Sequence, residues 1–126
     1  MTEPFYLPSR KYAFTVAFIG GLFESNPSIM GLFAEHLVAN EAQVLPYMLL
    51  PDVARWATAV ALTTPDDPVL RAVLDYIESR FVERNADVNA LIATSFLDFL
   101  TGQGPGEPEV RALLGPSCAA ELESWK

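Results

Sequence analysis

The sequence predicts an all-α fold, a compact bundle of about six or seven helices arranged loosely like stacked helical hairpins. Between Asp87 and Leu100 apolar residues recur at helical spacing, behind an aspartate that can cap a helix. Most of the ten prolines follow a residue that can cap a helix, and proline is tolerated in a first turn. No run alternates apolar and polar residues beside a hairpin turn. These three observations favour helices throughout.

The expected helices follow from start signals and apolar stripes. Their ranges are Lys11 to Glu24, Pro27 to Asn40, Pro51 to Thr63, Pro68 to Asn85, Val88 to Thr101, Pro108 to Leu114 and Pro116 to Trp125. The first contains an uncharged run that ends at Phe23. The second, fourth and seventh begin with a capping residue followed by proline, and the third has only Leu50 before Pro51, so a preceding turn could continue into it.

The fourth expected helix has the clearest amphipathic pattern. One apolar stripe is formed by Leu70, Val73, Leu74, Ile77 and Phe81. The connection 85–87 is too short for the chain to wander, which predicts that the fourth and fifth helices pack as a hairpin. Residues 102–107, rich in glycine, form a loop before two short terminal helices, and they lack the lysine that a phosphate-binding loop requires.

Composition predicts one domain over residues 1–126 and limits the function classes. A chain of 126 residues with 51% apolar residues can bury a core without a metal or disulfide. Its formal charge of −8 disfavours nucleic acid and anionic membrane surfaces. The uncharged run Tyr12 to Phe23 is too short to span a bilayer. A single cysteine, Cys118, fits a reducing compartment, so we expect a cytoplasmic protein.

Acidic residues give one candidate site. Asp75, Glu78 and Glu83 follow the polar side of the fourth expected helix, and Asp98 lies in the fifth. These four carboxylates are the candidate partner-binding residues. Arg71 and Arg80 lie at helical spacing from Asp75 and Glu83, so local ion pairing is the alternative explanation.

A second candidate site uses the only histidine. Glu35, His36 and Tyr47 could line a ligand pocket between helices, because imidazole titrates near neutrality and a carboxylate can orient it. One histidine cannot supply a metal site with helical donor spacing, so we expect neither a metal nor a cofactor. Cys118 could be a nucleophile at a helix start, but its apolar neighbours favour packing.

The segment Val88 to Leu100, together with Leu113 to Pro116 and Glu121-Leu122, resembles an uncharacterised family of small acidic helical bacterial proteins. The resemblance runs from about Ile29 onward and rests on apolar spacing and a short asparagine, serine and phenylalanine signature. Members of this family look similar to toxin-immunity proteins. The resemblance implies a protein partner and carries over no catalytic residue.

These observations lead to three hypotheses. The first is a non-catalytic cytosolic immunity protein that occludes a companion toxin, its acidic helix faces meeting a basic toxin domain. The second is a small helical enzyme or ligand-binding protein. The third is a homodimeric regulatory scaffold, for which Trp125 could be an interface anchor. Between catalysis and binding, the scarcity of reactive residues favours binding.

Overall fold

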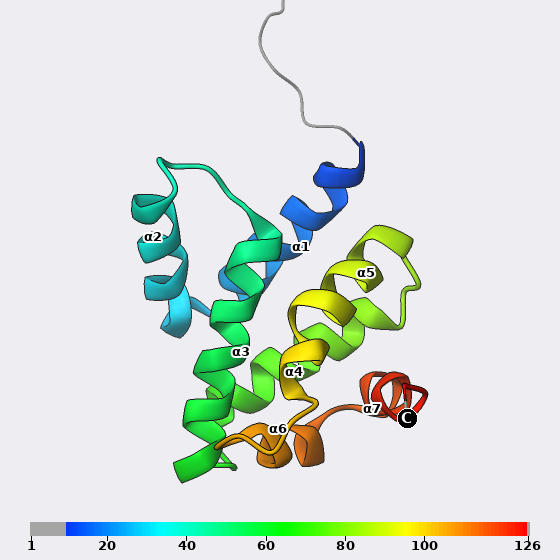
Figure 1. Cartoon of the computed structure of the whole chain (residues 1–126). Coiled ribbons are helices and arrows are strands. Elements are labelled where there is room, and N and C mark those ends of the chain that lie inside the picture. Colours follow the sequence, from blue (N-terminus) through cyan, green and yellow to red (C-terminus); the bar gives the residue numbers. More distant parts are fainter. Residues whose placement is uncertain (1–9, 126) are drawn as a thin grey trace, which may run out of the picture.

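The computed structural model describes residues 10–125, and within this range the chain forms seven α-helices, two short 3₁₀ helices and no strand (Figure 1). In chain order the elements are α1 (Arg10–Ser25), the 3₁₀ helix η1 (Pro27–Ile29), α2 (Met30–Ala39), α3 (Pro46–Thr63), α4 (Pro68–Phe81), α5 (Ala86–Ser95), the 3₁₀ helix η2 (Leu97–Leu100), α6 (Glu107–Leu113) and α7 (Pro116–Glu123). The predicted all-α bundle is confirmed. None of the helices in this part of the chain is long and apolar enough to cross a membrane.

Helix α5 lies in contact with α1, α3 and α4, and its residues Val88, Leu91 and Ile92 are buried. Around it, α6 packs on α3 and η2, and α7 packs on α4. Helix α2 lies against α3 on the other side of the bundle from α7 (Figure 1). The hydrophobic effect of burying these apolar stripes holds the helices together.

The predicted caps are partly correct. The side chain of Asp67 accepts hydrogen bonds from the amides of Val69 and Leu70, at 2.8 and 3.1 Å, and so caps α4 as expected. For α5 the expected cap, Asp87, is wrong. Asn85 caps this helix by accepting from the amide of Asp87, at 3.0 Å, and from that of Val88.

The expected fifth helix is interrupted at Phe96. Its backbone angles, φ −127° and ψ −60°, are not helical, and the chain continues as η2. A continuous α-helix would turn Leu97 roughly half a turn away from Val88, towards solvent. The break instead buries Leu97 and Leu100 completely. It leaves Phe99 43% exposed, although Phe99 lies in the Asp87 to Leu100 segment whose apolar residues recur at helical spacing.

Helix α3 begins five residues earlier than expected, at Pro46, and continues through Pro51. Proline at position 51 lacks the amide that would donate to the preceding turn. The helix tolerates this loss because Leu49, Leu50 and Val53 are fully buried around it. Apolar packing therefore outweighs the missing hydrogen bond.

The glycine-rich connection before α6 is held by specific contacts. The amide of Gly102 donates to the Glu107 carboxylate at 2.7 Å, and Arg111 donates to the carbonyls of Leu100 and Gly102. Gly106 adopts φ +85°, and a methyl group added there would overlap the backbone carbonyl of Thr58 in α3. Glycine at 106 thus allows α6 to approach α3 closely.

Candidate functional site

The four acidic residues predicted to bind a partner lie in different environments. Asp75 and Glu78 are on α4, Glu83 follows the end of that helix, and Asp98 is on η2. Asp75, Glu83 and Asp98 are exposed, whereas Glu78 is half-buried. The structure therefore does not gather the four carboxylates into one site.

Glu78 has a structural role. Its carboxylate accepts hydrogen bonds from the amides of Ser117, at 2.8 Å, and Cys118, at 3.0 Å, at the start of α7. Gly115 allows this approach, because a Cβ atom there would overlap the Glu78 side chain. Burial by itself would raise the pKa of Glu78, but the hydrogen bonds from Cys118 and Ser117 outweigh it and the pKa is lowered. The side chain is an N-cap supplied by another helix.

Glu83 forms an ion pair with Arg80, whose guanidinium also lies over an aromatic ring. The distance from Arg80 Nη1 to Glu83 Oε2 is 3.1 Å, and the guanidinium carbon is 5.5 Å from the ring centroid of Tyr76. The predicted pairing of Arg80 with Glu83 is thus observed. The suggested pairing of Arg71 with Asp75 is not, since Asp75 has no ion pair with any residue from 10 to 125.

Asp98 lies beside an exposed tryptophan. A shallow hollow of about 310 Å³ is lined by Ala93, Thr94, Asp98 and Trp125, which come from α5, η2 and the end of the described chain. Trp125 is 42% exposed, and its indole Nε1 donates to the Glu121 carboxylate at 3.0 Å. Within residues 10–125 no hydrogen bond or ion pair engages the Asp98 carboxylate.

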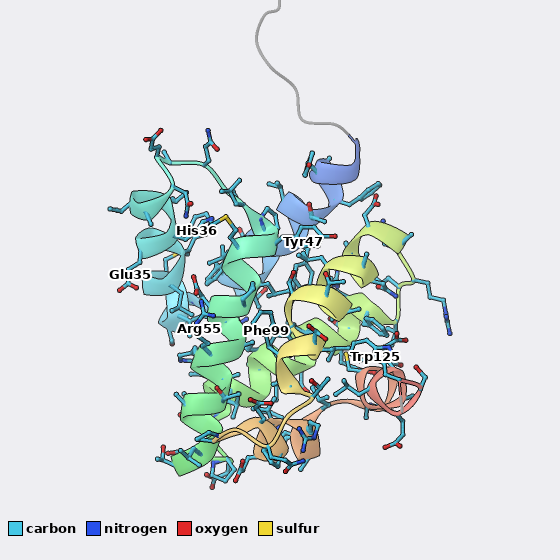
Figure 2. All side chains as sticks on the ribbon, viewed as in Figure 1. Glu35, His36, Tyr47, Arg55, Phe99 and Trp125 are labelled. Carbon is cyan, nitrogen blue, oxygen red and sulfur yellow. The ribbon has the colours of Figure 1, made fainter. Side chains whose placement is uncertain are left out.

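The second candidate site is not a convergent set of polar groups. His36 is buried, and its Nε2 accepts the amide hydrogen of Leu45 at 3.0 Å, while Nδ1 lies 3.2 Å from the Asn40 side-chain nitrogen. The ring thereby holds the connection between α2 and α3. Glu35 is exposed and points away from the bundle, and Tyr47 is 40% exposed on α3 (Figure 2).

Cys118 is enclosed in the core at the start of α7, 1% exposed. Burial raises the pKa of its thiol, and the neighbouring Glu78 and Glu121 carboxylates raise it further. The thiol therefore stays protonated at neutral pH, which favours the packing role. Among residues 10–125 no three histidine, cysteine, aspartate or glutamate side chains are grouped to hold a metal ion.

Sequence reasoning named Asp98 and Trp125 separately and did not place them together. The hollow that they share depends on the break at Phe96 and on the packing of α7, neither of which leaves a periodic signal. Phe99 on η2 and Trp125, which follows α7, are both exposed, and Figure 2 labels them. One sequence feature could have suggested the site: Trp125 is a large aromatic residue that belongs to no apolar stripe.

The chain matches no protein-family model, and no curated protein or solved structure is significantly similar to it.

Proposed function

We propose that this chain is a non-catalytic protein-binding protein that occludes a basic surface of its partner, as an immunity protein occludes a companion toxin. One observation carries the proposal: the exposed Asp98 carboxylate, unpaired within residues 10–125, lies beside the half-exposed indole of Trp125. Exposed tryptophan is a frequent anchor of protein interfaces. A carboxylate next to such an anchor selects a partner of opposite charge.

The charge of the whole chain also supports binding to a basic partner. The formal charge of −8 attracts a basic partner and accelerates its encounter. Asp75, also exposed and unpaired among the described residues, adds to the field. The mechanism is occlusion: the acidic chain covers the basic groups of the partner, and no bond is made or broken.

The ligand-pocket alternative has less support. Both ring nitrogens of His36 already face groups of this chain, namely the Leu45 amide and the Asn40 side chain. Glu35 points outward (Figure 2), so the carboxylate expected to orient the imidazole does not do so. These contacts give His36 a structural role.

The experiment pairs this chain with the product of the reading frame adjacent to its own, each purified, and measures association kinetics at low and at physiological salt. We expect direct binding with an association rate that falls as salt rises, because screening weakens the attraction between opposite charges. Asp98→Lys should slow association about tenfold at low salt.

Glu35→Lys is the matched control. It makes the same change of charge on α2, which lies on the other side of α3 from Trp125 (Figure 2), and should leave the rate within about twofold. Failure of the purified proteins to bind at low salt would refute the proposed function for this pair. Equal slowing by both variants would refute the role of the Asp98 surface.

A further inference from the structure

In the cluster formed by Tyr76, Arg80 and Glu83, one cation interacts with both an aromatic ring and a carboxylate. The Arg80 guanidinium sits over the Tyr76 ring, 5.5 Å from its centroid, and pairs with the Glu83 carboxylate at 3.1 Å. A cation in this position gains from the negative face of the ring and from the carboxylate together. The ring, the cation and the carboxylate of this cluster all come from α4 and the residues just after it.

The hollow at Asp98 and Trp125 contains two of these three groups. It has an aromatic ring and a carboxylate, and no cation is present among the residues from 10 to 125 that line it. Arg111 is on the lining of a separate hollow, with Leu122 and Trp125, and its guanidinium donates to the Leu100 and Gly102 carbonyls. Among the described residues, the missing component is a positive charge.

A hydrogen bond to Glu121 restrains the Trp125 indole. The hydrogen bond from Trp125 Nε1 to Glu121, at 3.0 Å, fixes the edge of the ring and leaves 42% of the side chain exposed. The hollow of about 310 Å³ is at the lower end of the size range of small-molecule sites, which suits one side chain better than a larger ligand. The Asp98 carboxylate excludes an anionic occupant.

We propose that this hollow receives an arginine side chain of the protein partner, which stacks on the Trp125 indole and pairs with the Asp98 carboxylate. The proposal rests on the proposed function and names the chemistry by which the partner is recognised. Arginine fits better than lysine because its planar guanidinium stacks on a ring and binds a carboxylate through two donors.

The test uses the full chain and a blocked tripeptide, acetyl-Gly-Arg-Gly-amide, followed by the indole and amide signals in ¹⁵N NMR spectra. We expect saturable shifts at the Trp125 indole and at the Thr94 amide. The indole of Trp56, which packs against the core, should not shift. The same peptide with citrulline, a neutral isostere of arginine, should give no saturable shift.

Three variants make the outcome specific. Asp98→Asn should weaken peptide binding about threefold to fivefold, as expected for removal of one exposed ion pair. Asp75→Asn removes the same charge from α4 and should leave binding unchanged. Lys126→Ala tests this chain's own terminal lysine as the occupant, and binding that appears only in this variant would overturn the proposal.

Equal shifts with the arginine and citrulline peptides, or no saturable shift at Trp125, would also overturn it. The peptide experiment needs no partner protein, so it fails independently of the association experiment. Partner binding without a peptide response would refute the arginine site alone. A peptide response without partner binding would refute the tested pairing alone.

Discussion

At the scale of single residues, Glu78 shows how one side chain can belong to the fold although its position in the sequence suggests a surface role. It joins α4 to the first amides of α7, 39 positions further along the chain. A carboxylate at a helix start accepts hydrogen bonds from amides that have no partner within the helix, and it also interacts favourably with the helix dipole. The amphipathic pattern of α4 places Glu78 on the polar face, but it contains no information about which helix start lies opposite.

Replacing Glu78 with glutamine should destabilise the protein, and the loss should depend on pH. Because the hydrogen bonds lower the pKa of Glu78 below its ordinary value of 4.5, the folded protein binds this proton less tightly than the unfolded chain. The stabilisation is therefore fully present above pH 4.5 and is lost as the pH falls through the folded-state pKa. Above that range we expect Glu78→Gln to lower the free energy of unfolding by about 0.5 to 1 kcal/mol, the lower part of the capping range because solvent screens the carboxylate.

Urea unfolding of the wild type and of Glu78→Gln, measured from neutral to acidic pH, tests this expectation. The two free energies of unfolding should converge in acid, since a protonated Glu78 resembles glutamine. Glu35→Gln, an exposed change of the same type on α2, should follow the wild type throughout. A constant difference between wild type and Glu78→Gln at every pH would contradict the assigned linkage.

At the scale of elements, the sequence predicted the number and order of the helices well and their ends less well. The Asp67 cap was predictable because a capping residue acts on amides two and three positions away. The break at Phe96 was not, because it follows from where Leu97 must lie to reach the core. The sequence left open that a turn before Pro51 continues into α3, but it did not place the start at Pro46, because burial around Pro51 overrides a local helix-breaking signal.

The crossing of α1 and α4 depends on a glycine and a tyrosine. The Tyr76 hydroxyl donates to the Phe18 carbonyl at 2.9 Å, and the ring centroids of Phe18 and Tyr76 lie 5.4 Å apart. Burial raises the pKa of Tyr76, which keeps the hydroxyl protonated and able to donate. A methyl group at Gly21 would overlap that hydroxyl oxygen. Gly21 and Tyr76 should therefore be energetically coupled.

We expect Gly21→Ala to destabilise the protein by about 1 to 3 kcal/mol through overpacking, and Tyr76→Phe to cost about 1 kcal/mol through the lost hydrogen bond. In the double variant the overlap with the hydroxyl is gone. Its destabilisation should therefore be smaller than the sum of the two single effects, by a coupling of about 1 to 2 kcal/mol. Thermal or urea unfolding of the four proteins completes the double-mutant cycle.

Gly20→Ala is the matched control for this cycle. It makes the same substitution one residue earlier, at a position where an added Cβ meets nothing within 4 Å. Alanine should there stabilise the helix by about 0.5 to 1 kcal/mol, because it loses less backbone entropy than glycine. Strict additivity of Gly21→Ala and Tyr76→Phe would show that the close approach does not govern this crossing.

At the scale of the whole molecule, the candidate site was less predictable than the fold. The acidic composition indicated a basic partner but could not say which carboxylates are free to meet it. Of the four predicted residues, Glu78 is used as a helix cap and Glu83 is paired with Arg80. Asp98 gains its importance from Trp125, which is distant in sequence and meets it only through the packing of α7. The proposed partner binding therefore depends on which charges the fold leaves unpaired.

The excess of negative charge should make stability depend on salt. Sixteen acidic and eight basic residues give a formal charge of −8, and the described residues form two ion pairs, Arg55 with Asp52 and Arg80 with Glu83. Both pairs are exposed and contribute about 0 to 1 kcal/mol each. Salt screens these weak attractions and also the repulsion among unpaired carboxylates, and the repulsion involves more charges. We therefore expect Tm to rise when NaCl is increased from about 0.01 M to about 0.15 M.

Circular dichroism at neutral pH measures this change, with Glu35→Lys as the control. That substitution brings the formal charge from −8 to −6. It should raise Tm at low salt and reduce the response to NaCl, because less repulsion is left to screen. A Tm that falls as NaCl rises would mean that the two ion pairs outweigh the net repulsion. The negative field would then be largely balanced within the folded chain, and less of it would remain to attract a basic partner.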